Sequence, residues 1–275
     1  MKILVYIAIW KRPEVTRICF EGVKRLIKNS NHQINCYCVV SEDWAEVMCE
    51  EFGFEYKRVK NEPLGHKMNR GLYGAMKYKW DYIMTLGSDD LISDELLKIY
   101  EPYMNKGIGL IGIDKVYFAD LKNKKTKLVD YDLQIVGAGR LISREAIKDT
   151  ATRVRVTVLQ GCSTIINSYY LGQITYMPQA EVYRLGAIVS PSQEKKFELW
   201  DGELMCTLDN NSNNRLIMNH VSNKCIEVGE VPLIVDIKTD ENLWDYDSLD
   251  GTNKDFNLLN DFRELRQESD VSVES

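Results

Sequence analysis

Over its first 95 residues the chain repeats one pattern, a short apolar run followed by a stretch in which apolar residues have helical spacing. Such alternation is typical of βαβ units and of a largely parallel sheet covered by helices. Pro13 supports one of these helices, because a proline in the opening turn has no N–H to leave unpaired. The pattern predicts strands at 2–9, 34–40, 54–59 and 82–86, and helices at 13–29, 44–52 and 67–79.

Beyond Gly109 the pattern changes to shorter strand-like pieces joined by tight turns. We expect these pieces to make antiparallel or mixed additions to the sheet, at 110–118, 127–131 and 135–142, and we expect a further strand at 231–237. No internal repeat and no linker separates two cores, which predicts one domain with two lobes. The polar and acidic residues 267–275 predict a disordered tail.

Charge and composition exclude some functions. The net charge of −6 argues against broad binding to nucleic acid, which needs many phosphate contacts. A local basic groove stays possible, and residues 122–127 (KNKKTK) are the densest basic run, although a solvated hairpin tip explains them better. No apolar run approaches the roughly 20 residues that cross a bilayer. The seven cysteines are scattered without a Cys-x-x-Cys pair, which predicts reduced thiols and a cytoplasmic protein.

Polar residues follow three of the predicted strands, at 10–12, 41–43 and 87–90. Ligands of open parallel sheets bind outside the carboxyl ends of the strands. The third group is the most informative, because Asp89 and Asp90 are adjacent carboxylates after a buried strand. Hard oxygen ligands of this kind suit Mg²⁺ or Mn²⁺. By spacing alone, the two acids are equally well explained as the start of a turn before a helix capped by Ser93.

The stretch 64–91, LGHKMNRGLYGAMKYKWDYIMTLGSDDL, resembles the centre of the inverting GT-A glycosyltransferases. In that family an Asn-x-Gly-Leu helix precedes a strand that ends in an Asp-x-Asp metal motif. The opening IAIWKRPE resembles the family's first strand and its Asn-Arg-Pro turn. The residues that match are Asn69, Gly71, Leu72, Asp89, Asp90, Arg12 and Pro13.

The resemblance implies an α/β fold, a GT-A Rossmann-like mixed sheet flanked by helices. It places a single domain at 1–266, with a nucleotide-sugar lobe at about 1–115 and an acceptor lobe at about 116–266. It implies transfer of a sugar from a nucleotide-sugar, a UDP-sugar first of all, to a hydroxyl acceptor with inversion. The acceptor stays open, and a glycan or a hydroxylated DNA base would both serve.

The resemblance also implies a Mn²⁺ or Mg²⁺ ion on the donor diphosphate. The first Asp of the family motif is Gly87 here, so Asp89 is expected to carry the metal, with Asp90 or a water completing the shell. A later segment often supplies a further ligand in the family. His220 and Asp236 are the two candidates, and both have ordinary structural explanations.

A later segment, FELWDGEL at 197–204, resembles the family's Glu-Asp-x-Asp-Leu segment. The match implies that Asp201 is the catalytic base, with Glu203 as the second choice. Further residues are expected to contact the donor, although helix ends, solvated lysines and plain turns explain several of them as well. They are Trp10, Arg12, Glu42, Asp43, Lys67, Asn69, Ser88, Arg140 and Lys238.

Two other functions compete with this interpretation. Nucleotidyltransferases that make nucleotide sugars share much of the architecture, but they carry a Gly-rich loop after strand one, and residues 10–13 contain no glycine. A non-catalytic nucleotide-binding protein of the same fold is the other alternative, motivated by Gly87.

Overall fold

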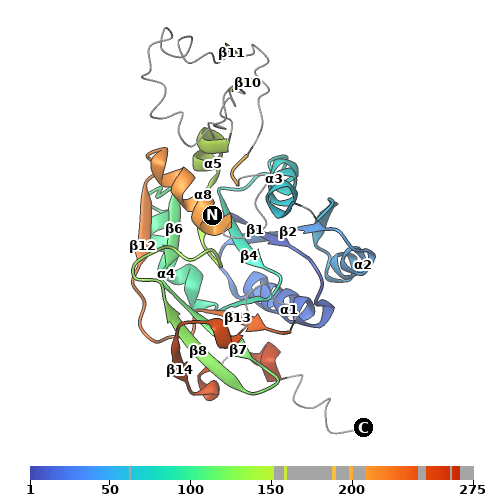
Figure 1. Cartoon of the computed structure of the whole chain (residues 1–275), viewed down its shortest axis with the longest axis vertical. Coiled ribbons are helices and arrows are strands. Elements are labelled where there is room, and N and C mark those ends of the chain that lie inside the picture. The colour runs from blue at the N-terminus through green and yellow to red at the C-terminus, as the bar shows by residue number, and fades with distance from the viewer. Residues whose placement is uncertain are drawn as a thin grey trace.

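A seven-stranded mixed sheet forms the centre of the computed structural model (Figure 1). The structure describes residues 1–61, 63–151, 158–159, 188–189, 198–200, 208–240, 246–260 and 262–266. In the order in which they pair, the strands are β12 (Asn223–Ile226), β6 (Leu110–Ile113), β9 (Leu141–Ser143), β4 (Tyr82–Gly87), β1 (Lys2–Ala8), β2 (Gln33–Val40) and β3 (Glu55–Arg58). β9 is antiparallel to both of its neighbours, and the other pairs are parallel.

Helices cover both faces of this sheet, and β1 shows why. Its odd residues Ile3, Val5 and Ile7 belong to one apolar core, and its even residues Leu4 and Tyr6 belong to another, because successive side chains of a strand point to opposite faces. On the first face lie α1 (Pro13–Asn29), α2 (Asp43–Phe52) and α4 (Glu95–Met104), and on the second lie α3 (Leu64–Ala75), α5 (Arg144–Ala151) and α8 (Leu208–Met218).

A second, five-stranded sheet begins where β4 ends. In pairing order it contains β14 (Thr252–Lys254), β8 (Lys125–Asp130), β7 (Lys115–Asp120), β13 (Ile234–Lys238) and β5 (Asp90–Ile92). β13 runs parallel to β7 and antiparallel to β5. Val116, Phe118 and Ile234 pack in the same core as Val5 of the first sheet. The two sheets therefore share a core, and the predicted α/β mixed-sheet fold flanked by helices is confirmed.

Shorter elements complete the described chain. β10 (Val158–Leu159) pairs with β11 (Ile188–Val189), and three 3-10 helices follow β13, namely η2 (Tyr246–Ser248), η3 (Phe256–Leu259) and η4 (Arg263–Arg266). None of the helices in these described ranges is long and apolar enough to cross a membrane. The predicted tail at 267–275 lies outside them.

Two predicted strands were wrong. Of the strand predicted at 135–142, only residues 141 and 142 lie in a strand, β9, and residues 135–140 lie outside any strand. The strand predicted at 110–118 is two strands in different sheets, which meet at Asp114, a buried residue whose carboxylate accepts a hydrogen bond from the Val228 N–H. The Asn-rich stretch 209–214 has a composition typical of loops, but it lies within α8. Its buried side includes Ser212 and Asn213, so the apolar periodicity that marks a helix is missing from the sequence.

Gly71 lies where α3 packs on the sheet. A Cβ built there would overlap Val39 and the hydroxyl of Tyr6. Gly71→Ala should therefore lower the free energy of unfolding by about 1–3 kcal/mol, as overpacking does in other cores. Urea unfolding measures the change. Gly229→Ala is the matched control, because no atom lies within 4 Å of its Cβ position. Equal stability of the two variants would contradict this packing.

Candidate metal and nucleotide site

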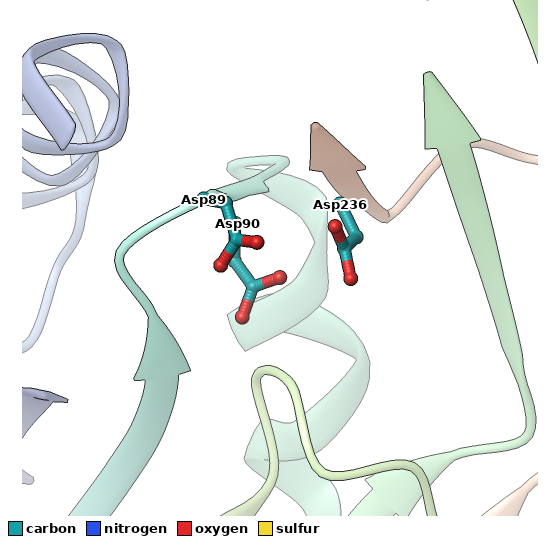
Figure 2. A group of neighbouring side chains, drawn as sticks. All are labelled: Asp89, Asp90 and Asp236. Atoms are coloured by element: carbon teal, nitrogen blue, oxygen red, sulfur yellow. The ribbon is translucent and has the colours of Figure 1, made fainter. Parts of the chain in front are cut away.

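Three carboxylates meet where the two sheets join. Asp89 and Asp90 follow β4, and β13 pairs with β5 so that Asp236 stands directly opposite Asp90. The backbone N–H of Ile237 donates to the Asp89 carbonyl at 2.8 Å, which fixes the turn against β13. One ligand oxygen from each of the three acids lies within 4.8 Å of the others (Figure 2). The pairing of β5 with β13 therefore builds the cluster.

Two cations balance part of this charge. Arg12 Nη1 lies 2.6 Å from Asp89 Oδ2, and Lys238 Nζ lies 2.9 Å from Asp236 Oδ2. Three acids against two cations leave the cluster with one formal negative charge when every group is ionised. The cluster is largely buried, and water screens it little.

Burial and mutual repulsion shift the pKa values of two acids. Burial, followed by the charges of Asp236 and Asp89, raises the pKa of Asp90 well above its ordinary value, although the Gly87 N–H donates to Asp90 at 2.6 Å. Burial, followed by the charge of Asp89, raises the pKa of Asp236 to about 7, against the opposing effect of Lys238. When all three acids are ionised, the positive charges of Arg12 and Lys238 are therefore too few to neutralise the cluster.

The cluster fits a divalent cation. Asp236 Oδ1 is buried and has no hydrogen-bond partner in the described part of the chain, and such an atom is unfavourable unless something binds it. The three acids offer hard oxygen ligands, which suit Mg²⁺ and Mn²⁺. Asp89, Asp90 and Asp236 are the residues that would hold the ion.

The turns after β1, β2 and β4 lie side by side at the carboxyl edge of the sheet. Arg12 Nη2 reaches Ser88 Oγ at 3.4 Å, and the backbone N–H of Lys11 donates to Glu42 at 2.7 Å. The Lys11 ammonium lies 4.6 Å from the centre of the Trp10 ring. Lys11 and Arg12 both have left-handed backbone conformations, with φ of 56° and 57°, which is uncommon for residues other than glycine. Backbone strain of this kind clusters at functional sites.

Asp43 does not belong to this group. Its side chain is 89% exposed and pairs with Arg58 at 2.7 Å, at the start of α2. The expectation that Asp43 contacts the donor is therefore not supported, and the ordinary role of an acid in the first turn of a helix explains it.

Lys67 lies beneath the turns and is neither solvated nor directed at a phosphate site. Its ammonium donates to Ile9 O, to Ser41 Oγ at 3.2 Å and to Asn61 Oδ1 at 2.9 Å, which uses all three of its N–H groups. Burial lowers the pKa of Lys67 to about 8. Lys67 thus ties together the ends of the first two strands, and the expected direct contact with the donor is corrected to a supporting role.

Asn69 is the second correction among the expected donor contacts. Its side-chain oxygen accepts from the backbone N–H groups of Leu199 at 2.9 Å and Trp200 at 3.1 Å, and its amide donates to Trp200 O at 2.7 Å. Trp200 is fully buried and stacks on Tyr6, with ring centres 6.1 Å apart. Asn69 therefore anchors the residues just before Asp201. Asp201 and Glu203 lie outside the described residues.

Arg140 is the third correction. It is fully buried, and its guanidinium donates to Thr85 at 3.2 Å, to Asn213 at 2.6 Å and to Ser212 at 2.9 Å. These contacts bind α8 to β4, so Arg140 acts inside the fold and not on a donor diphosphate. Lys238, in contrast, lies at the carboxylate cluster, where it pairs with Asp236.

The structure separates His220 from the cluster and brings Asp236 into it. His220 is exposed and follows α8, and two residues later Ser222 O accepts from the N–H of Leu110 at the start of β6. β4 and β6 run in the same direction on either side of β9, so His220 lies at the opposite edge of the sheet from Asp89. The alternative that named His220 as a ligand is wrong for that reason.

Comparison with known proteins shows the fold alone. No protein-family model and no curated protein sequence matches the chain. Two crystal structures of TarS from S. aureus share its fold. TarS 1–349 aligns with a TM-score of 0.51 at 10% identity over 86% of this chain, and TarS aligns with a TM-score of 0.54 at 11% identity over 88%.

TarS 1–349 in complex with UDP-GlcNAc aligns with a TM-score of 0.46, at 14% identity and over 88% of this chain. The chain spans 60% of the length of TarS 1–349 and 37% of the longer TarS chain. The similarity to TarS 1–349 and to the longer TarS chain shows a shared α/β fold with mixed sheets flanked by helices.

The raised pKa of Asp236 predicts how stability depends on pH. Between the ordinary value of 3.8 and about 7, the folded protein holds a proton that the unfolded chain releases, so the free energy of unfolding falls as pH rises through that window. Without metal, Asp236→Asn should be more stable than wild type at about pH 8, by on the order of 1 kcal/mol. Near pH 4 the two should be similar. Urea unfolding in EDTA measures both, and a variant less stable at about pH 8 would contradict the crowding of these acids.

Proposed function

We propose that the chain is a glycosyltransferase that moves a sugar from a nucleotide-sugar donor to a hydroxyl group of an acceptor. The observation that carries the proposal is the convergence of Asp89, Asp90 and Asp236 with Arg12 at the carboxyl edge of a sheet of this fold. Open α/β sheets bind their ligands at that edge. UDP is the first nucleotide to test, because the resemblance to the GT-A glycosyltransferases implies that Glu42 lies beside the uracil or ribose of the donor.

The aspartate cluster would hold Mn²⁺ or Mg²⁺ against the donor diphosphate. When bound, such an ion supplies Lewis-acid stabilisation of the charge that develops on the leaving group. Arg12 and Lys238 flank the cluster and add positive charge to the same place. Ser88 Oγ accepts a hydrogen bond from the guanidinium of Arg12 and so orients it. Trp10 and Glu42 belong to the turns that would border the nucleotide.

The proposed transfer inverts the anomeric carbon, and Asp201 takes the proton of the acceptor hydroxyl. Asn69 supports this role indirectly, because three hydrogen bonds hold the backbone of residues 199 and 200 just ahead of Asp201. Glu203 is the second choice for the base. A cytoplasmic location is part of the proposal, and the free thiols of the five described cysteines agree with it.

The two competing functions remain distinguishable by experiment. A nucleotidyltransferase would make a nucleotide sugar from a nucleoside triphosphate and a sugar phosphate. A binding protein would take up UDP without metal and without hydrolysing the donor. The unsatisfied oxygen of Asp236 favours a metal-dependent enzyme over the binding protein.

Metal-dependent nucleotide binding is the first test. UDP should raise the melting temperature of the wild-type protein, and it should do so more strongly with Mn²⁺. A ligand that binds only the folded state raises the free energy of unfolding by about 2.7 kcal/mol at a hundredfold excess over its dissociation constant. In Asp236→Asn, the part of the increase in melting temperature that depends on Mn²⁺ should be lost. His220→Ala is the matched control and should behave as wild type. The absence of a shift with any nucleoside diphosphate would refute the proposal.

The base is tested by Asp201→Asn. The amide has nearly the same shape but cannot accept a proton, so transfer should fall by about 10²–10⁴-fold or more while calorimetric donor binding changes little. Transfer is measured on an acceptor chosen from a panel of glycans and hydroxymethylated DNA. Near-normal transfer, or a product that retains the anomeric configuration of the donor, would overturn the assignment, and a collapse confined to Glu203→Gln would move the role to Glu203.

A further inference from the structure

A basic pocket lies on the five-stranded sheet, away from the aspartate cluster. It has a volume of about 430 Å³ and is formed by the tip of the β7–β8 hairpin, by β14 and by η2. Four lysines and one acid line it, together with Tyr246 and two uncharged polar residues. The charged residues are Lys124, Lys125, Lys127, Lys254 and Asp247. On a chain with a net charge of −6, this local excess of positive charge stands out.

Contacts with the protein position two of these lysines without removing their charge from the pocket. Lys127 donates to the carbonyl oxygens of Tyr246 at 3.1 Å and Leu249 at 3.2 Å, and its ammonium lies 4.8 Å from the centre of the Tyr246 ring. These described partners are neutral. Lys254 pairs with Glu230 at 2.6 Å, but that glutamate is 67% exposed, and exposed pairs contribute little. Lys254 is therefore able to turn toward an anionic ligand.

The pocket residues Lys125, Lys127 and Asn253 lie on the same face of the sheet as Asp90 and Asp236, whereas Lys254 lies on the opposite face of the edge strand β14. Residues directly opposite each other on neighbouring strands share a face. Strand pairing aligns one such row across all five strands, in the order Asp90, Asp236, Phe118, Lys127 and Asn253. Adjacent strands are about 4.8 Å apart, so the backbone of Lys127 lies roughly 10 Å from that of Asp236. One extended ligand would reach both places.

We propose that this pocket binds a phosphate group of the acceptor, while the reacting hydroxyl of the same molecule lies at the aspartate cluster. Lysine ammonium groups bind phosphate oxygens through charge-assisted hydrogen bonds. The pocket suits one phosphate or diphosphate group. Nucleic acid would need many spaced contacts, which the net charge of the chain disfavours. The role in acceptor binding rests on the proposed glycosyltransferase function, whereas the binding of phosphate does not.

Calorimetry with inorganic pyrophosphate tests the pocket directly. EDTA in the buffer removes metal-dependent binding at the aspartate cluster. The wild-type protein should bind pyrophosphate, and Lys125→Gln combined with Lys254→Gln should weaken binding about tenfold or more, which is about 1.4 kcal/mol. Lys98→Gln combined with Lys148→Gln removes the same charge from two exposed ion pairs elsewhere and should leave the affinity unchanged. Equal affinity in the pocket variant, or an equal loss in the control, would overturn the proposal.

Further experiments identify the molecule that carries the phosphate. They also separate the proposed phosphate site from the proposed glycosyltransferase function. If a lipid headgroup carries the phosphate, the wild-type protein should sediment with phosphatidylcholine vesicles that contain phosphatidic acid, and the pocket variant should not. A single-stranded oligonucleotide that binds more tightly than pyrophosphate through the same lysines would refute a small phosphate ligand. UDP with Mn²⁺ should bind the pocket variant as it binds wild type. If UDP binds neither protein while pyrophosphate still depends on the lysines, the proposed function fails and the phosphate site stands.

Discussion

The repulsion among three largely buried carboxylates is the constraint on which the rest of the site depends. The pairing of β5 with β13 holds Asp90 and Asp236 opposite each other, and the turn after β4 adds Asp89. A folded chain accepts such an arrangement only with compensating positive charge. Arg12 provides part of it from a turn with a left-handed backbone, and Lys238 provides another part from the same strand as Asp236. The remaining negative charge is the physical reason to expect a divalent cation.

The second sheet also carries charged residues farther from the edge at which the nucleotide is proposed to bind. The row of residues that begins with Asp90 and Asp236 passes Phe118 and reaches Lys127, so that the acidic centre and one lysine of the basic pocket share a face of the sheet. Charges of opposite sign at a fixed separation favour a ligand with a neutral reacting group and a distant anion. A glycosyl acceptor with a hydroxyl and a phosphate has that form.

Local patterns in the sequence were sufficient for the first half of the fold. The helix expected at 13–29 has those bounds in the structure, and the strands that precede Arg12, Glu42 and Asp89 were correctly placed, because their apolar periodicity is strong. The sequence alone could not decide between His220 and Asp236 as a metal ligand, because the answer depends on which distant strand pairs with β5. Burial of polar groups was equally hidden. Lys67, Asn69 and Arg140 resembled surface or ligand-binding residues, yet each makes its hydrogen bonds inside the fold, to groups far along the chain.

A crystal structure with UDP and Mn²⁺ tests the central claim most directly, because the anomalous signal of manganese locates the ion without reference to the protein chain. We expect one strong peak in contact with carboxylate oxygens of Asp89, Asp90 or Asp236, with the diphosphate of UDP bound to the same ion. Ordered UDP elsewhere on the molecule, or manganese bound with no contact to these three acids, would contradict it.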